Sequence, residues 1–278
     1  MNKNFYYTLI TGASEGFGKA LALDCARRKM NLILVALPGP ELHDLADFIK
    51  VHHAVDVIIF EKDLCEDESC FELFNEVNRL RLQVNMLLNN AGIGSTVLFE
   101  DGNIKLFEKQ IKLNVLATTL ITHLFLDMLK RNSPSYILNV GSLASFFPLP
   151  KKQVYGATKS FIYYFSKSLR KELKKDKVYV SVLCPGGMYT NMGVKLVITA
   201  GNYLSRISSM DPGEVVPAAM NGLFGKKEVI VPGRLNKIFL LLDMLLPAFV
   251  KAILINNTMR SLNQNTRSTR LLPSGLAA

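Results

Sequence analysis

Short runs of consecutive apolar residues recur along this chain, and they constrain the fold more than any other feature. Strands that are covered on both faces have such continuous runs, as in a parallel sheet. The segments between them are long enough for right-handed crossover helices. We therefore predict an α/β fold, a Rossmann-like doubly wound parallel sheet of about seven strands with helices on both faces. The predicted strands are residues 5–10, 32–35, 55–60, 84–89, 135–140, 178–183 and 228–231.

The first predicted strand runs into a glycine-rich turn, and a helix follows at once. Gly12 permits a tight turn, Gly16 lets the backbone approach a pyrophosphate, and Gly18 allows close packing of helix on strand. Backbone amides at the start of the helix can then bind phosphate groups. A purely structural turn is the alternative, but the flanking strand and helix favour a dinucleotide site. The expected cofactor contacts in the turn are Gly12, Ser14, Glu15, Gly16, Phe17 and Gly18.

Tyr155 and Lys159 are four residues apart in a helical pattern, so both lie on one helix face. A free tyrosine has a pKa of about 10, and a nearby ammonium favours the phenolate, so we expect Lys159 to lower the pKa of Tyr155. Ser142 follows a predicted strand, at the edge where open α/β sheets bind ligands, and its hydroxyl can stabilise charge on a substrate oxygen. The alternatives are an ordinary pair on a helix surface and a turn serine.

These motifs, together with others in the same order, resemble the short-chain dehydrogenase/reductase family. The turn has the spacing T-G-x-x-x-G-x-G, residues 89–92 read N-N-A-G, and residues 155–159 fit Y-x-x-x-K. Pro185, Gly186 and Thr190 fit the family's P-G-x-x-x-T. The match covers residues 5–232. Within the family, the chain resembles members that act on hydrophobic ketones of the 3-oxoacyl or steroid-like kind.

The resemblance implies an NAD(P)(H)-dependent oxidoreductase that transfers a hydride between nicotinamide and a ketone or secondary alcohol, with Tyr155 as the catalytic acid/base. It makes Asn114, in the helical run from Ile111 to Leu120, the catalytic asparagine that positions a water relaying protons to Lys159. The catalytic set is then Asn114, Ser142, Tyr155 and Lys159. The cofactor contacts that the resemblance implies outside the turn are Leu37, Asp63, Leu64, Asn90, Ala91, Gly92, Tyr155, Lys159, Pro185, Gly186, Met188 and Thr190.

The end of the second strand bears on the form of the cofactor. An acidic side chain there commonly holds the 2′-hydroxyl of NAD, whereas the 2′-phosphate of NADP needs positive charge. Ala36 stands where typical NAD enzymes of the family have aspartate, and Leu37 stands where many NADP enzymes have arginine. Glu15 occupies a position that is often basic in NADP enzymes. The sequence departs from both patterns, and the missing acid at Ala36 favours NADP(H).

We expect one Rossmann-fold domain over residues 1–260 and a disordered tail over residues 261–278. Residues 188–225 are interpreted as a substrate lid, because an insertion at the carboxyl end of a strand often covers a ligand. Residues 235–256 are amphipathic and predict a helix packed on its own domain or on a second subunit, with a membrane-surface helix as the alternative. An apolar substrate pocket is expected from Leu143, Phe146, Phe147, Met188 and Tyr189.

The net charge of +10 attracts anions such as phosphorylated cofactors or acidic membranes, so peripheral membrane contact stays open. The absence of a zinc-finger or RNA-binding signature disfavours nucleic acid. The four cysteines have no metal-ligand spacing, so we expect no metal site and a cytoplasmic protein with reduced thiols. By analogy with the family we expect a homodimer or homotetramer. A non-catalytic nucleotide-binding redox sensor is the alternative, and the intact set of Ser142, Tyr155 and Lys159 argues against it.

Overall fold

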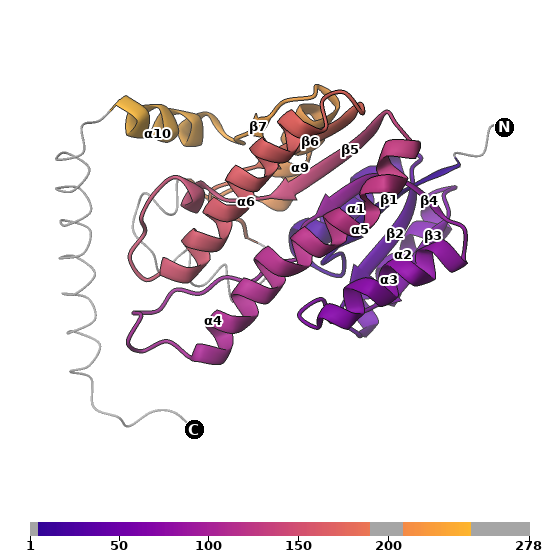
Figure 1. The fold of residues 1–278 in the computed structure, drawn as a ribbon, viewed down its shortest axis with the longest axis horizontal. Coiled ribbons are helices and arrows are strands. Elements are labelled where there is room, and N and C mark those ends of the chain that lie inside the picture. Colours follow the sequence, from indigo (N-terminus) through magenta and orange to yellow (C-terminus); the bar gives the residue numbers. More distant parts are fainter. Residues whose placement is uncertain (1–4, 190–207, 246–278) are drawn as a thin grey trace. The chain divides into compact units, whose positions relative to one another are not determined.

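The computed structural model describes residues 5–189 and 208–245 and contains a seven-stranded parallel sheet with helices on both faces (Figure 1). The strand order is β3-β2-β1-β4-β5-β6-β7, which confirms the predicted doubly wound fold. The order reverses between β1 and β4, and open α/β sheets bind ligands outside the carboxyl ends of the strands at such a switch point. The strands are β1 (Tyr6–Thr11), β2 (Asn31–Ala36), β3 (Val57–Glu61), β4 (Gln83–Asn89), β5 (Ser135–Val140), β6 (Val178–Leu183) and β7 (Val229–Ile230).

Helices cover each face of the sheet and bury one core cluster on either side. The helical elements are α1 (Gly16–Arg27), α2 (Pro40–His52), α3 (Asp67–Arg79), α4 (Ile104–Ile111), η1 (Lys112–Ala117), α5 (Thr118–Arg131), η2 (Leu143–Ser145), α6 (Gln153–Glu172), α9 (Pro212–Phe224) and α10 (Arg234–Leu245). One cluster joins α1, α2 and α9 to the sheet, and the other joins α3, α5 and the end of α6. Consecutive strand residues such as Leu9 and Ile10 enter opposite clusters, which explains the continuous apolar runs.

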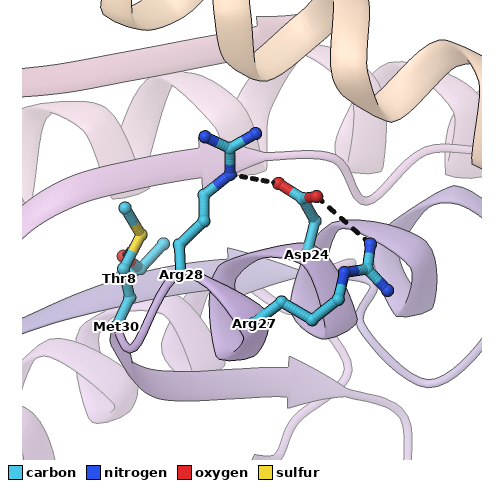
Figure 2. A network of polar contacts seen from close by, with 5 residues as sticks. All are labelled: Thr8, Asp24, Arg27, Arg28 and Met30. Carbon is cyan, nitrogen blue, oxygen red and sulfur yellow. Dashed lines mark hydrogen bonds and ion pairs between the residues drawn. The ribbon is translucent and has the colours of Figure 1, made fainter.

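Asp24 of α1 takes part in a polar network on the face of the sheet that α1, α2 and α9 cover. Figure 2 shows its carboxylate between two arginines, with Oδ1 at 3.1 Å from Arg27 Nη2 and Oδ2 at 2.5 Å from Arg28 Nε. The guanidinium of Arg28 also lies 5.7 Å from the ring centroid of Phe224, the last residue of α9. The network therefore links α1 to α9, and it serves the packing of these helices.

Ile104–Arg131, which comprises α4, η1 and α5, is the one helical stretch within the described ranges whose length and hydropathy would allow it to cross a membrane. Phe125 and Leu129 of α5 are fully buried in the core against the sheet, as expected for a helix of a folded domain. The middle of the stretch, η1, is π-helical, where the sequence predicted ordinary helix. Single π-helical turns occur often at functional sites.

The structure covers the predicted lid and C-terminal helix in part. Within residues 188–225, α9 packs into the core through residues such as Val215 and Met220, and the predicted lid stays a prediction. Residues 190–207, which include Thr190, lie outside the described residues. The predicted helix over 235–256 begins in α10, and its remainder and the predicted tail also lie outside them. The chain divides into two compact units, Met1–Lys237 and Ile238–Ala278.

Candidate active site

The glycine turn between β1 and α1 has the geometry that a phosphate cradle requires. Gly12 and Gly16 have φ angles of 64° and 55°, a region that favours glycine. A Cβ atom on Gly18 would stand 1.9 Å from the carbonyl oxygen of Gly12, so only glycine allows this approach of helix to turn. Glu15 is the N-cap of α1, and its side chain makes no cap hydrogen bond within the described chain. The first amides of α1 are therefore available to an anion, which fits a dinucleotide pyrophosphate.

Asn90 ties the loop after β4 to this turn. Its Nδ2 donates to the carbonyl oxygens of Thr11 and Gly12, both at 2.9 Å. In return, the hydroxyl of Thr11 accepts hydrogen bonds at 3.0 Å from the backbone N–H groups of Asn90 and Ala91. The two loops of the switch point are thus one unit. The predicted contribution of Asn90 to cofactor binding therefore acts through the shape of the glycine turn.

The other cofactor contacts predicted near the adenosine differ in exposure. Leu37, directly after β2, is 59% exposed, and Asp63 follows β3, where its Oδ1 accepts from the backbone N–H of Cys65 at 2.9 Å. Phe17 and Leu64 are buried in the two core clusters, so their side chains pack inside the protein. Only the backbone of Phe17, in the first turn of α1, remains for a phosphate.

The loop after β6 lies beside the loop after β5. The carbonyl oxygen of Pro185 accepts from the backbone N–H of Leu143 at 2.8 Å. A Cβ atom on Gly186 would stand 2.1 Å from the carbonyl oxygen of Ser208, so glycine is required where the chain returns after residue 207. Met188 forms an isolated parallel bridge with Met210. These contacts fasten the described ends of the predicted lid to the sheet edge.

Ser142, Tyr155 and Lys159 converge at the carboxyl end of β5. The hydroxyl of Ser142 lies near enough to the phenol of Tyr155 to affect its pKa, and its Oγ accepts from the backbone N–H of Ala144 at 3.1 Å. Lys159 is buried, and its Nζ donates to the carbonyl oxygen of Val140 at 2.7 Å. This Nζ lies 5.9 Å from the ring centroid of Tyr155. The structure therefore brings together three predicted residues that are separated along the chain.

Burial shifts the pKa values of Tyr155 and Lys159 in opposite directions. It raises the pKa of Tyr155 above its ordinary value, and the nearby hydroxyl of Ser142 only opposes this shift. It lowers the pKa of Lys159 from 10.5 to about 8. The predicted lowering of the Tyr155 pKa by Lys159 is therefore wrong for this structure. The physical reason is that the amine bonds Val140, away from the phenol, while burial penalises the phenolate.

Asn114 lies in η1 and links the loop after β4 to α6. Its Oδ1 accepts from the backbone N–H of Ile93 at 2.9 Å, and its Nδ2 donates to the carbonyl oxygen of Ile93 at 2.9 Å and to Thr158 Oγ1 at 3.0 Å. A Cβ atom on Gly92 would lie 3.0 Å from Asn114 Oδ1 and 3.3 Å from Lys159 Nζ. Gly92 therefore makes room for both side chains, and the predicted proton relay through Asn114 remains a prediction.

Two residues that the sequence analysis did not assign to the site also contact it. Cys184, after β6, is fully buried near Ser142 and Lys159, and burial raises the pKa of its thiol to about 12. The Nζ of Lys152 lies 5.4 Å from the ring centroid of Tyr155. Neither residue has a spacing in the sequence that could have pointed to these contacts, since both depend on how loops meet.

A cavity of about 600 Å³ lies beside the catalytic cluster, against another face of α6. Phe146 and Phe147, which were predicted to surround the reacting centre, line it. Ser142, Tyr155 and Lys159 are not among its lining residues, but Lys152, which contacts the Tyr155 ring, is. The predicted substrate pocket stays a prediction.

Sequence comparison relates the chain to known enzymes. The family model described as "short chain dehydrogenase" matches residues 7–200. A very-long-chain 3-oxoacyl-CoA reductase from Anas platyrhynchos is 30% identical over 195 residues, which cover 67% of this chain and 61% of the relative. An 11-beta-hydroxysteroid dehydrogenase-like 3 protein from Arabidopsis thaliana is 34% identical over 185 residues, with 66% and 59% covered. The chain thus spans less than two thirds of the length of these relatives.

Solved structures extend the likeness to nearly the whole chain. The bulky-bulky ketone specific alcohol dehydrogenase from Comamonas testosteroni is 26% identical, with a TM-score of 0.74 and coverage of 99% of this chain and 98% of that one. A short-chain dehydrogenase from Sphingobium yanoikuyae in complex with NADPH is 27% identical, with a TM-score of 0.74 and 98% of both chains covered.

Proposed function

The chain belongs to the short-chain dehydrogenase family, and on that premise we propose that it is an NAD(P)(H)-dependent oxidoreductase that interconverts a ketone and a secondary alcohol. The observation that carries the proposal is the cluster of buried Ser142, buried Lys159 and half-buried Tyr155 at the carboxyl-terminal end of the sheet, where the glycine turn also lies. Burying an ammonium such as Lys159 is costly, and a fold retains such a group where chemistry needs it. A non-catalytic nucleotide sensor has no need of that arrangement.

Tyr155 and Ser142 have different roles at the substrate oxygen. When bound, the nicotinamide supplies or accepts the hydride. Tyr155 gives a proton to the oxygen during reduction and takes it back during oxidation, and Ser142 holds the same oxygen by a hydrogen bond. The raised pKa of Tyr155 keeps the phenol protonated at neutral pH, so it is ready to act as an acid. Lys159 carries a positive charge at neutral pH, but this charge does not offset the cost that burial adds to the phenolate.

We propose a hydrophobic ketone or alcohol as the substrate, and NADP(H) as the cofactor favoured slightly over NAD(H). The names of the relatives support the choice of substrate, because they refer to 3-oxoacyl-CoA, hydroxysteroid and bulky ketone substrates. The missing acid at Ala36 and the NADPH-bound structural relative support the choice of cofactor.

The test measures NADPH and NADH oxidation with a panel of bulky ketones. We expect turnover in the wild-type protein and a loss of about 10²- to 10⁴-fold in Tyr155→Phe, the range attributed to general acid catalysis. Tyr164→Phe is the matched control, because Tyr164 lies on the same helix and is 67% exposed. Cofactor binding should persist in both variants. Binding without turnover in the wild-type protein, or turnover that Tyr155→Phe leaves unchanged, would contradict the enzyme proposal.

We also propose a cytoplasmic homodimer or homotetramer. Exposed apolar side chains on α4 and α6 support association, since Ile104 is 75% exposed and Phe161 is 43% exposed. Size-exclusion chromatography with light scattering measures the mass directly, and a monomer at micromolar concentration would refute the association. Flotation with acidic liposomes tests the alternative of peripheral membrane contact.

A further inference from the structure

The carboxylate of Glu61, at the end of β3, lies next to the end of β2, where Ala36 replaces the acidic residue that many NAD enzymes have. Ala36, the last residue of β2, pairs in register with Glu61, the last residue of β3. In-register residues of adjacent parallel strands project to the same face, and the strands are about 4.8 Å apart. Glu61 therefore stands one strand away from the position at which an acidic side chain commonly holds the ribose of NAD.

The side chain of Glu61 crosses to the loop that leaves β2. Its Oε1 accepts from the backbone N–H of Gly39 at 3.2 Å and lies 3.0 Å from Nε2 of His43. Gly39 and His43 belong to the N-cap and first turns of α2, which follow Ala36 almost directly. The hydrogen bonds with His43 and Gly39 lower the pKa of Glu61, so its carboxylate is ionised at neutral pH.

The nearest lysine does not neutralise the negative charge of Glu61, because it is paired with other carboxylates. Lys62 is its neighbour in sequence, but its Nζ bonds Glu72 at 2.7 Å and Glu76 at 2.9 Å, on α3. Glu41 adds a second carboxylate, with Oε2 at 2.9 Å from where a Cβ atom on Gly39 would stand. Exposed Leu37 offers no positive charge. A 2′-phosphate at this loop meets repulsion, whereas a 2′-hydroxyl meets an acceptor.

We infer that Glu61 has the role that an acidic residue at position 36 has in typical NAD enzymes. It controls the preference between NAD(H), with its 2′-hydroxyl, and NADP(H), with its 2′-phosphate. The inference rests on the proposed function, because it assumes that the cofactor binds at the glycine turn. Ala36 removes the usual barrier to NADP(H), and Glu61 restores part of it from the next strand. Both cofactors then bind, in a ratio that Glu61 controls.

The alternative is that Glu61 merely anchors the loop before α2. An anchor would affect the two cofactors equally, because loop disorder weakens both, whereas a specificity residue changes their ratio. Glu61→Gln separates the two roles. The amide keeps the shape and an oxygen that can accept from Gly39, but it loses the charge. Glu61 is exposed, with 38% of its side chain accessible, so the substitution does not threaten folding.

The experiment titrates the full chain with NADH and NADPH by fluorescence at pH 7.5. We expect the ratio of Kd for NADH to Kd for NADPH to rise about tenfold in Glu61→Gln, the equivalent of one charge-assisted hydrogen bond. Glu68→Gln, which removes an exposed carboxylate on α3, is the control and should leave the ratio unchanged. Adding Ala36→Asp to Glu61→Gln should bring the ratio back down.

The possible results separate the two proposals. A wild-type chain that binds neither nucleotide overturns the proposed function and this inference together. A chain that binds both nucleotides, with a ratio that Glu61→Gln leaves unchanged, overturns only the inference. Equal weakening of NADH and NADPH in Glu61→Gln also overturns it, because that result identifies a loop anchor.

Discussion

Replacing Lys159 by methionine should make the protein more stable and inactive. The pKa of Lys159 falls from 10.5 to about 8 on folding, and at ~1.4 kcal/mol per pKa unit this burial costs about 3 kcal/mol at neutral pH. Methionine fills a similar space without charge, but it leaves the carbonyl oxygen of Val140 without its 2.7 Å partner, which costs about 1–2 kcal/mol. The expected net gain in the free energy of unfolding is about 1–2 kcal/mol at pH 7.

The pH dependence of this gain identifies its cause. The unfolded chain keeps Lys159 protonated up to a pKa of about 10.5, whereas the folded protein keeps it protonated only up to about 8. Below pH 8 the folded wild-type protein therefore carries the full cost of the buried charge. Between pH 8 and 10.5 the unfolded state binds more protons, so wild-type stability rises relative to the variant. Because wild-type stability rises by ~1.4 kcal/mol per pH unit above pH 8, the advantage of Lys159→Met should disappear near about pH 9 and reverse at higher pH.

Urea denaturation of both proteins at pH 7 and pH 10, followed by circular dichroism, measures the difference. Lys171→Met is the matched control, because Lys171 is exposed on the same helix and should change stability little at either pH. The reasoning fails if Lys159→Met is less stable at pH 7, or if its stability difference from wild type is the same at both pH values. A stabilising substitution that removes activity is the signature of a functional residue kept at the expense of stability.

Three further substitutions test the site and its surroundings. Gly18→Ala should abolish nucleotide binding, because its Cβ would stand 1.9 Å from the carbonyl oxygen of Gly12; a Kd for NADPH near the wild-type value would contradict this. Asn90→Ala removes two 2.9 Å hydrogen bonds to the turn and should weaken NADPH binding about tenfold, with Asn78→Ala on exposed α3 as the control. Gln110→Met should raise the free energy of unfolding by about 1 kcal/mol, because the buried amide has no hydrogen-bond partner in the described structure; a loss of stability in urea denaturation would disprove this.

The sequence was sufficient for features that depend on local order. The continuous apolar runs predicted the parallel sheet, because a strand covered on both faces has no polar side. The tight turn at Gly12 and the close packing at Gly18 were predicted, since both follow from a strand that meets a helix within a few residues, whereas the pyrophosphate contact of Gly16 stays a prediction. Helical spacing predicted that Tyr155 and Lys159 share a helix face, and Ser142 together with the family resemblance made them catalytic candidates.

The features that the sequence could not supply depend on distances between elements. The pKa of Tyr155 was predicted in the wrong direction, because spacing places Lys159 on the same helix face but does not reveal that its amine turns to Val140. The contact of Glu61 with His43 requires the register of β2 and β3, and a register cannot be derived from either strand alone. The π-helical turn around Asn114 was also missed, and the hydrogen bonds of its side chain to Ile93 and Thr158 join it to two segments that lie far away in the sequence.

The opposite pKa shifts of Tyr155 and Lys159 have a common origin, and it bears on the direction of proton transfer. Burial penalises charge on both groups, so the site at neutral pH holds a neutral phenol beside one ammonium. A neutral phenol can donate a proton at once, which is the step that reduction of a ketone requires. Oxidation requires the phenolate, whose formation in this site needs positive charge in addition to that of Lys159. Reduction of a ketone should therefore be faster than oxidation of the matching alcohol at neutral pH, which the initial rates in the two directions measure.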